Sequence, residues 1–424
     1  MINKETDIYS GDNSRKELKN ITLFTSGLII YSVSFALCYS QFPIATFHAG
    51  QLVGLALIVV SSITLCKFNI EDRYLSIFYV AYLIWLAIII TRGFQTDSTF
   101  IKDMLYNARY GLMPYFVPIV LLFTKHSFFY KKIFDAIIIL GIFYLIFDVI
   151  FIRELLSSDR DNSTSVSIIE IFTSTLSLSA GFILLTYNYH SKKRILFSLF
   201  IVVFSLFFAV IRARRGLIFM CSSMLLCFYL IFTIHSKLKF AIIYISILLA
   251  SIGALYLSNI YKIGNRNIFS FVLDRGDEDT RTGVEMYFYD DLKTKDWIIG
   301  KGINGQYFCP DIEEDQATNY RSVIETDYLQ IILNGGLLSL GLLLLILIPA
   351  VCLGLFYSKN MLSKGAAIWI LLWIFYLYPA RVSTFTLHYI LVWISVGICY
   401  SKFMRKMSEN EMKEFLNPPV NYLT

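Results

Sequence analysis

Short arginine-rich segments interrupt the apolar runs of this sequence. The densest is Arg212-Ala-Arg-Arg-Gly216, where Arg212, Arg214 and Arg215 lie between two long apolar stretches. Such charges are costly at a membrane edge, and the turn is too short for all three groups to reach water. A guanidinium group binds phosphate or carboxylate through two parallel hydrogen bonds. The segment therefore predicts an anion site centred on Arg215, although arginines that reach towards lipid phosphates would give the same pattern.

A second candidate is Arg281, which lies near the start of a helix predicted over residues 277–297. The N-terminus of a helix favours anions through its unpaired N–H groups, and Arg281 would add a full charge. Pairing with an acidic neighbour along the helix is the alternative. Trp297, at the end of this helix, could stack on a sugar ring or pack into a core. Gly300 and Gly302 follow it and are typical of a turn.

A third candidate is the segment Glu325-Thr-Asp-Tyr-Leu, which leads into a late apolar run. A carboxylate at the head of a helix and close to a bilayer can act as a general base, and Glu325 is the first choice for that role. Asp327 and Tyr328 are further candidates for contact with a ligand. The alternative is that Glu325 and Asp327 only complement the helix dipole.

Two isolated arginines and two isolated acids complete the set of candidates. Arg381 and Arg109 lie at turns beside apolar runs and could bind the same anion, or could reach to the membrane surface. Asp148 and Glu170 lie near helix ends, where we expect each to pair with an arginine. The five histidines show no HExxH spacing, and there is no P-loop, which disfavours a metal hydrolase or an ATP-driven pump. We therefore expect no metal and no cofactor.

The composition defines the elements that must position these residues. Hydrophobic residues make up 56% of the 424 residues and charged residues only 16%, whereas soluble domains carry roughly 25% charged residues. The net charge of +6 is spread along the chain without a long basic run, which disfavours a nucleic-acid partner. A spanning helix needs ~20 apolar residues, and twelve candidates lie at roughly 21–40, 49–66, 74–91, 109–123, 133–152, 167–187, 195–211, 216–234, 240–258, 327–357, 365–380 and 383–401. The prediction is an all-α polytopic membrane protein in a lipid bilayer.

Charge asymmetry orients these spans. With both termini in the cytoplasm, every short inner loop is basic, as the positive-inside rule requires. The inner side then carries 16 Lys and 4 Arg, while the outer side carries 5 Lys and 12 Arg. Positive charge outside opposes insertion and needs another reason, such as an anionic ligand. The resulting domains are 1–258 (spans one to nine), 259–324 (an outer loop), 325–401 (spans ten to twelve) and 402–424 (a cytoplasmic tail).

The outer loop is the largest segment outside the expected spans. At about 65 residues it is too small for an extensive core of its own, so we expect it to pack on the outer face of the bundle. Long loops of this kind are usually functional. The tenth span is long and is interrupted at Asn334-Gly335-Gly336. We expect it to start as a helix outside the core of the bilayer.

The order and spacing of three motifs resemble those of the Wzy-type O-antigen polymerases and the related O-antigen ligases. The first is Arg215-Gly216 at the outer start of a span. The second is Arg281 followed by Trp297 and by Gly300-x-Gly302. The third is Glu325-Thr-Asp-Tyr-Leu with Gly336 downstream. The motifs cover the segment 212–336, and the twelve spans with a large loop before the tenth also fit.

The resemblance implies a GT-C-like glycosyltransferase that acts at the periplasmic side of the bacterial inner membrane. Its donor and acceptor would be undecaprenyl-diphosphate-linked oligosaccharides, joined without a metal. In that reading Glu325 is the base, Arg215 and Arg281 stabilise the departing diphosphate, and Arg381 assists. A chain-length regulator and a flippase would be its partners.

Three other functions stay open from the sequence. Ligases of the family carry His where this chain has Glu325, which favours a polymerase over a ligase that transfers glycan to lipid A–core. A flippase or transporter would need charges along a central path, whereas here they gather at the outer face. A sensor or scaffold would leave the excess of outer arginines unexplained.

Overall fold

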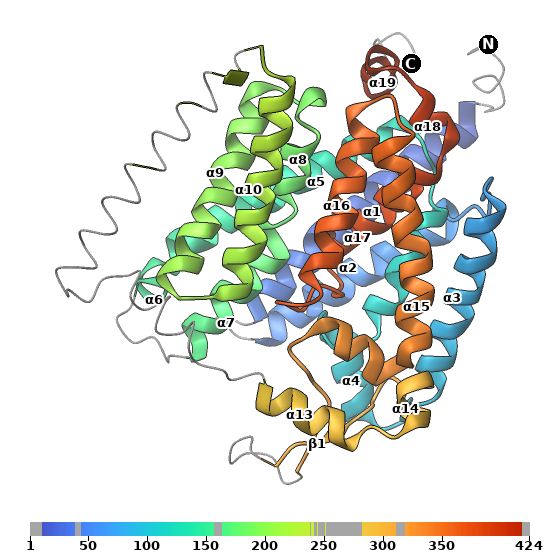
Figure 1. The fold of residues 1–424 in the computed structure, drawn as a ribbon, viewed down its shortest axis with the longest axis vertical. Coiled ribbons are helices and arrows are strands. Elements are labelled where there is room, and N and C mark those ends of the chain that lie inside the picture. Colours follow the sequence, from blue (N-terminus) through green and yellow to red (C-terminus); the bar gives the residue numbers. More distant parts are fainter. Residues whose placement is uncertain are drawn as a thin grey trace.

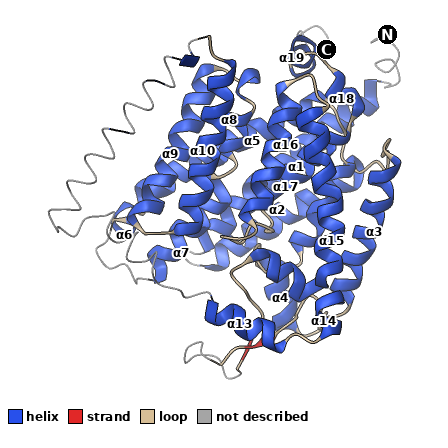
Figure 2. Ribbon diagram, viewed as in Figure 1, coloured by secondary structure: helices blue, strands red, loops and turns tan. Residues whose placement is uncertain are grey.

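The computed structural model describes residues 11–38, 44–156, 163–237, 282–310 and 319–417, together with residues 239, 240, 244 and 251. The described chain is a bundle of helices with one two-stranded hairpin (Figures 1 and 2). The long or apolar helices are α1 (Gly11–Cys38), α2 (Ile44–Leu65), α3 (Arg73–Thr91), η2 (Met113–Leu122), α5 (Ser127–Ile150), α9 (Lys192–Ile211), α10 (Arg215–His235), α15 (Asp327–Phe356), α16 (Met361–Tyr376) and α17 (Leu387–Tyr400). The shorter elements are α4 (Ser98–Tyr106), α6 (Ile152–Leu155), α7 (Ser163–Phe172), η3 (Thr173–Ser177), α8 (Ala180–Leu185), η4 (Tyr187–Tyr189), α13 (Thr282–Asp291), α14 (Thr294–Ile299), β1 (Tyr307–Phe308), β2 (Tyr320–Arg321), α18 (Lys402–Lys406) and α19 (Glu409–Leu416).

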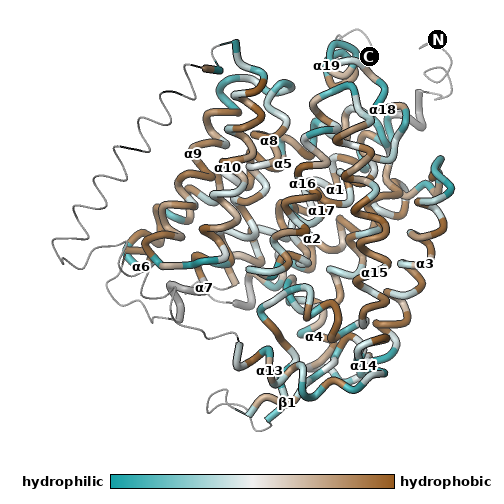
Figure 3. Tube along the Cα trace, in the orientation of Figure 1, coloured by the Kyte–Doolittle hydropathy of each residue, from teal (hydrophilic) through white to brown (hydrophobic). Residues whose placement is uncertain are grey.

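Eight helical segments of the described chain are long and apolar enough to cross a membrane. They coincide with eight of the expected spans and cover Arg15–Cys38, Phe47–Leu65, Arg73–Thr91, Ser127–Ile150, Ile168–Leu185, Lys192–Ile211, Arg215–His235 and Asp327–Phe356. Three shorter apolar helices, η2, α16 and α17, match the expected fourth, eleventh and twelfth spans. Most of the expected ninth span lies outside the described residues. Figure 3 shows apolar residues along most of the length of these helices, so the prediction of a polytopic all-α membrane protein is confirmed.

The two ends of the bundle differ in chemistry. At one end, α18 and α19 pack on the turns before α9 and α16: Asn188 donates to Glu409 at 3.2 Å, and the Lys359 amide donates to the Arg405 carbonyl at 2.9 Å (Figure 1). The lysine-rich turns lie at this end. At the opposite end lie α4, α6, α13, α14 and the arginine-rich turn between α9 and α10. We call this second end the arginine face.

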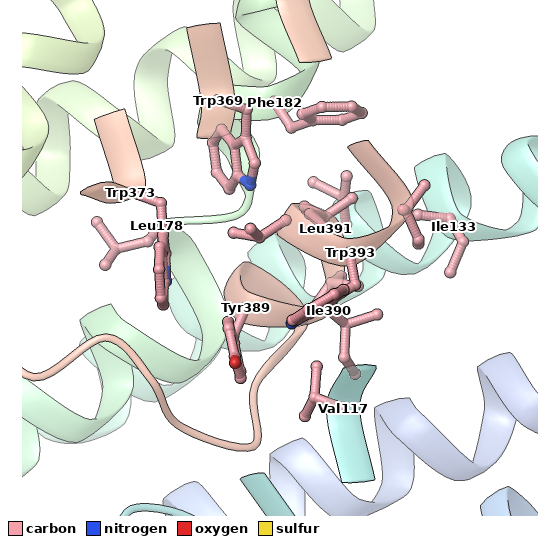
Figure 4. Packing of buried hydrophobic residues seen from close by; sticks show 14 of the residues in the cluster. Val117, Ile133, Leu178, Phe182, Trp369, Trp373, Tyr389, Ile390, Leu391 and Trp393 are labelled. Atoms are coloured by element: carbon pink, nitrogen blue, oxygen red, sulfur yellow. The ribbon is translucent and has the colours of Figure 1, made fainter. Parts of the chain in front are cut away.

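The core is centred on α17, whose side chains are buried almost all round. Trp393 of α17 and its neighbours Trp369 and Trp373 of α16 are each no more than 1% exposed. The Trp373 ring stacks on Tyr389 with centroids 5.1 Å apart, and Trp369 meets Phe182 of α8 edge-on at 5.4 Å (Figure 4). These ring contacts, together with the burial of nearly every α17 side chain, place α17 in the middle of the bundle.

The expected fourth span is a ten-residue 3-10 helix, η2. Pro118 lies within it and has no N–H to donate, which disfavours regular α-helical bonding. The Pro118 carbonyl accepts a hydrogen bond from the Tyr79 hydroxyl of α3 at 3.0 Å. This hydrogen bond ties η2 to α3 and gives the buried Tyr79 hydroxyl an acceptor.

The expected break in the tenth span is confirmed at Gly336, which has φ 70° and ψ −178°. Such a break leaves the carbonyls of the preceding turn without helical partners. The amides of Lys301 and Gly302 donate to the Leu333 and Asn334 carbonyls at 2.7 and 2.9 Å. The predicted glycine turn is thus the segment that satisfies the broken helix. A Cβ on Gly336 would lie 2.1 Å from the Ile298 carbonyl oxygen, so only glycine fits there.

The described part of the outer loop, residues 282–310 and 319–324, packs on α15 at the arginine face, in line with the expected packing on the bundle. Its buried residues Phe288, Leu292 and Tyr307 form one cluster with Leu329 and Leu333 of α15. The single helix predicted over 277–297 is wrong in one respect, because residues 282–299 form two helices, α13 and α14, divided at 292–293. The division lets both helices turn apolar side chains onto α15. Residues 277–281 and 311–318 lie outside the described chain.

Candidate functional site

A cavity of about 410 Å³ opens on the arginine face. Its charged lining comes from five arginines and two glutamates, which gives a formal charge of +3; these are Arg109, Arg214, Arg215, Arg321, Arg381, Glu170 and Glu325. They come from segments that lie far apart in the sequence. We call this the arginine cavity. Its charge and position make it the candidate anion site among the described residues.

The turn between α9 and α10 directs its three arginines to different places. The Ala213 amide donates to the Val210 carbonyl at 3.0 Å and the Arg214 amide donates to Ala209 at 2.8 Å. This pair of bonds is the Schellman ending of a helix, in which the residue at the Ala213 position adopts a left-handed conformation. Ala213 has φ 50° where glycine would be usual. The tight reversal leaves Arg212 as the C-cap residue of α9 and starts α10 at Arg215.

Gly216 allows α10 to approach the turn before α17. A Cβ at this position would lie 2.7 Å from the Pro379 carbonyl oxygen. The two segments therefore touch through backbone atoms, which brings Arg215 and Arg381 to the walls of one cavity. Glycine follows Arg215 in the predicted pair because any larger residue at position 216 would collide with the Pro379 carbonyl.

Arg381 is held firmly by its neighbours. Its guanidinium carbon lies 4.0 Å from the centroid of the Tyr110 ring, and its Nε donates to the Arg109 carbonyl at 3.0 Å. Burial lowers the pKa of Arg381, while Tyr110 and Asp327 oppose that decrease. Arginine stays charged at neutral pH under such shifts. Arg381 is therefore a fixed positive charge in the cavity wall.

Glu170 connects two of the arginines. Its carboxylate lies 3.1 Å from Arg214 Nη1 and 3.8 Å from Arg109 Nη1. The expected pairing of Glu170 with an arginine is confirmed. The same expectation for Asp148 is wrong, because Asp148 is buried in α5 with no ion pair to any described residue. The difference follows from position, since Glu170 faces the cavity and Asp148 faces the interior of the bundle.

Glu325 and Arg321 enter the cavity from the outer loop. Glu325 lies two residues before α15 and is exposed. Arg321 belongs to β2, which pairs with β1 so that Arg321 lies opposite Tyr307. Burial raises the pKa of the Tyr307 hydroxyl, and the neighbouring Arg321 guanidinium opposes that increase. Arg321 is not among the individually predicted candidates, although its position four residues before Glu325 was an available signal.

Two predicted ligands have partners within the protein instead. Arg212 is 4% exposed; its Nε donates to the Leu155 carbonyl at 3.0 Å and its Nη2 donates to the Glu154 carbonyl. Asp327 is fully buried and accepts hydrogen bonds from the Val382 and Ser383 amides at 2.8 and 2.6 Å. Neither residue lines the arginine cavity. Asp327 holds the turn that carries Arg381, and Arg212 ties the turn that carries Arg214 and Arg215 to α6.

The predicted aromatic residues Trp297 and Tyr328 do not line the arginine cavity. Trp297 stacks on Tyr289 with centroids 5.9 Å apart and meets Phe288 edge-on at 5.9 Å. Tyr328 stacks on Tyr378 at 6.4 Å. These contacts fit the packing alternative, because each ring already has an aromatic partner. Arg281 precedes α13 directly and lies outside the described residues.

The arrangement suits an anion with several oxygens. Guanidinium groups from four separate segments surround one space, and two carboxylates are placed where a proton acceptor could reach a bound molecule. Rigid, partly buried positive charges stabilise negative charge that develops during a reaction. Within the described residues, no group of three His, Cys, Asp or Glu side chains could hold a metal ion.

Comparison of this chain with protein-family models, with curated proteins and with solved structures finds no match in any of the three. The geometry of the arginine face therefore carries the functional argument.

Proposed function

We propose that this protein is a polysaccharide polymerase of the O-antigen type, which joins polyprenyl-diphosphate-linked repeat units at the outer side of the bacterial inner membrane. One observation carries the proposal: five arginines converge on one cavity at one end of a membrane-spanning bundle. A lipid-linked diphosphate carries several anionic oxygens at the membrane surface, where this end of the bundle would lie. The order of motifs in the sequence, which resembles that of Wzy-type polymerases, supports the same reading.

The lysine distribution supports the orientation. Lysine-rich turns lie at the opposite end from the arginine cavity, and positively charged loops stay in the cytoplasm. The arginine cavity would then face the periplasm, with both termini in the cytoplasm. In this proposal twelve spans form a GT-C-like membrane domain, and the outer loop covers the site.

The proposed reaction is one inverting displacement. A hydroxyl oxygen of the acceptor sugar bonds to the anomeric carbon of the donor, and the bond from that carbon to the diphosphate oxygen breaks. The hydroxyl proton passes to the Glu325 carboxylate, and the bonding electrons leave with polyprenyl diphosphate. Arg215 and Arg381, with Arg281, stabilise the departing negative charge. Loss of one such donor typically costs ~10²–10³ in rate.

A deletion strain complemented with variants tests this proposal. We expect wild type to restore a ladder of long surface polysaccharide and Arg215→Ala to leave glycolipid with a single repeat unit at unchanged protein level. Arg153→Ala is the matched control, because Arg153 is exposed in α6 on the same face but does not line the cavity. It should restore the full ladder.

The products also separate the alternatives. Loss of all repeat-bearing glycolipid in the deletion strain would point to the ligase or to a flippase and would reject the polymerase. A normal ladder in both the Arg215→Ala and Arg381→Ala strains would reject the proposed phosphate site.

A further inference from the structure

A second, smaller cavity of about 110 Å³ lies directly beside the arginine cavity. Three residues, Arg109, Tyr110 and Arg381, line both spaces and form the wall between them. Among the described residues around the smaller cavity, Arg109 and Arg381 are the only charged ones, and both belong to the wall shared with the arginine cavity, so the lining beyond that wall is uncharged. The remaining polar lining consists of tyrosines, amides and serines; these include Tyr82, Tyr115, Tyr389, Gln330, Asn334 and Ser339. We call this the neutral cavity.

Hydrogen bonds to the backbone fix the amides of the neutral cavity. Gln330 accepts from the Ile324 amide at 2.9 Å and donates to the Ser322 carbonyl at 3.1 Å and to Asn334 Oδ1 at 3.2 Å. Asn334 in turn donates to the Tyr115 hydroxyl at 2.8 Å. The hydroxyl proton of Tyr115 has no acceptor among the described residues. This series of hydrogen bonds therefore ends at the Tyr115 hydroxyl, which can donate to a ligand in the neutral cavity.

Arg381 offers a second unused donor at the shared wall. Its Nη1 is buried and has no hydrogen-bond partner among the described residues. A buried donor without a partner is costly, and a ligand oxygen that accepts from it would remove that cost. Because Arg381 lines both cavities, a ligand that satisfies Nη1 can extend from the positive space into the neutral one.

The lining selects the chemistry of the ligand. A cation finds no carboxylate among the described lining residues. An anion finds positive charge only at the shared wall, where Arg109 already pairs with Glu170 and Arg381 also faces the arginine cavity. Amide and phenol groups exchange hydrogen bonds with hydroxyl groups, and aromatic faces accept the C–H edges of a ring. The small volume suits one ring better than a chain. These properties together describe a single uncharged sugar.

We infer that the neutral cavity binds one uncharged sugar ring next to the diphosphate in the arginine cavity, with Arg381 in contact with both. The inference rests on the proposed function and adds where a sugar of the substrate lies. Tyr115 and Asn334 are then residues that position the sugar, through hydrogen bonds that the diphosphate alone does not use.

Binding to the full-length protein in nanodiscs tests the inference with two probes. One is sugar-free polyprenyl diphosphate, and the other is the same lipid carrying the repeat unit, extracted from cells that lack this protein. We expect wild type to bind the sugar-bearing lipid more tightly. Tyr115→Phe, which removes one hydroxyl, should weaken binding of the sugar-bearing lipid about tenfold and leave the sugar-free lipid unchanged.

Two further variants complete the design. Ser339→Leu fills the neutral cavity and should abolish the advantage of the sugar-bearing lipid. Tyr79→Phe is the matched control, because its hydroxyl binds the Pro118 carbonyl and Tyr79 lines neither cavity. It should behave as wild type. If Ser339→Leu also weakened sugar-free binding, the smaller Tyr115→Phe change would decide the question.

The outcomes separate the inference from the proposed function. Equal binding of the sugar-bearing lipid by wild type, Tyr115→Phe and Ser339→Leu would overturn the inference alone, provided that Arg215→Ala weakened binding of both lipids. No binding of either lipid by wild type would overturn the proposed function as well.

The sugar could come from the donor or from the acceptor. Methyl glycosides of the first and the last sugar of the repeat unit, titrated in the presence of bound sugar-free lipid, distinguish the two. Binding that depends on Tyr115 identifies the source and supports the inference. If neither glycoside nor the sugar-bearing lipid showed that dependence, the neutral cavity would not be a sugar site.

Discussion

Gly216→Ala is the sharpest test of how the arginine cavity is assembled. The new methyl group would lie 2.7 Å from the Pro379 carbonyl oxygen, whereas ordinary contact begins near 3.4 Å. The two segments must therefore separate by about 0.7 Å. The turn cannot yield easily, because the Val382 and Ser383 amides are bound to the buried Asp327 carboxylate. Helix α10, with Arg215 at its start, must move instead.

The expected cost has two parts. Overpacking of this kind destabilises a protein by about 1–3 kcal/mol, against about 0.5–1 kcal/mol that alanine gains over glycine inside a helix. Displacement of a positioning group by about 1 Å can cost roughly 10²-fold in rate. We therefore expect a lower thermal unfolding midpoint and a turnover about one to two orders of magnitude lower. Both are measurable on protein in nanodiscs with lipid-linked repeat units as substrate.

Gly341→Ala is the matched control, because nothing lies within 4 Å of the position that its Cβ would occupy in α15. That variant should be as stable as wild type or slightly more so, with unchanged turnover. If Gly216→Ala matched Gly341→Ala in both stability and turnover, the contact between α10 and the Pro379 turn would not control the site.

Three further predictions follow from the same turn and its neighbours. Arg212→Ala should destabilise the protein by about 2–3 kcal/mol, because the Leu155 and Glu154 carbonyls lose a charged donor. Turnover per folded molecule should be retained, and a loss of turnover without a loss of stability would show that Arg212 binds the ligand. Ala213→Gly should raise stability by about 1 kcal/mol, since glycine adopts a left-handed conformation without the penalty of a Cβ, and thermal unfolding measures it; a decrease would contradict the strain at φ 50°. Glu325→Gln should lower turnover about 10²–10⁴-fold with unchanged affinity for polyprenyl diphosphate. Normal polymer length in that variant would show that another residue is the general base.

Much of the membrane architecture follows from the sequence because it depends on local composition. Long apolar runs bounded by charge must be helices in a bilayer, since each helix satisfies its own backbone. The break at Gly336 and the turn at Gly300 and Gly302 were also visible, because glycine marks positions where other residues do not fit. The division of 277–297 into two helices was not visible, because packing on α15 decides it.

The candidate site shows more clearly that contacts between distant segments are not predictable from the sequence. Arg109, Arg215, Arg381 and Glu325 were found as separate residues, and the structure brings them into one cavity. Arg212 carries the same chemistry as Arg215 and lies three residues away, yet it is absent from the cavity lining and binds backbone carbonyls of α6. Residue type and spacing do not distinguish the two.

Hydropathy and charge act residue by residue, so a polytopic membrane protein, the helices that can cross a membrane and the uneven placement of lysine and arginine along the chain are all readable from composition. The packed structure is needed to see which arginines converge, that Asp327 anchors the turn of Arg381, and that a neutral cavity adjoins the positive one. These features depend on contacts between segments up to 272 residues apart, as for Arg109 and Arg381, and such contacts arise only when the helices pack.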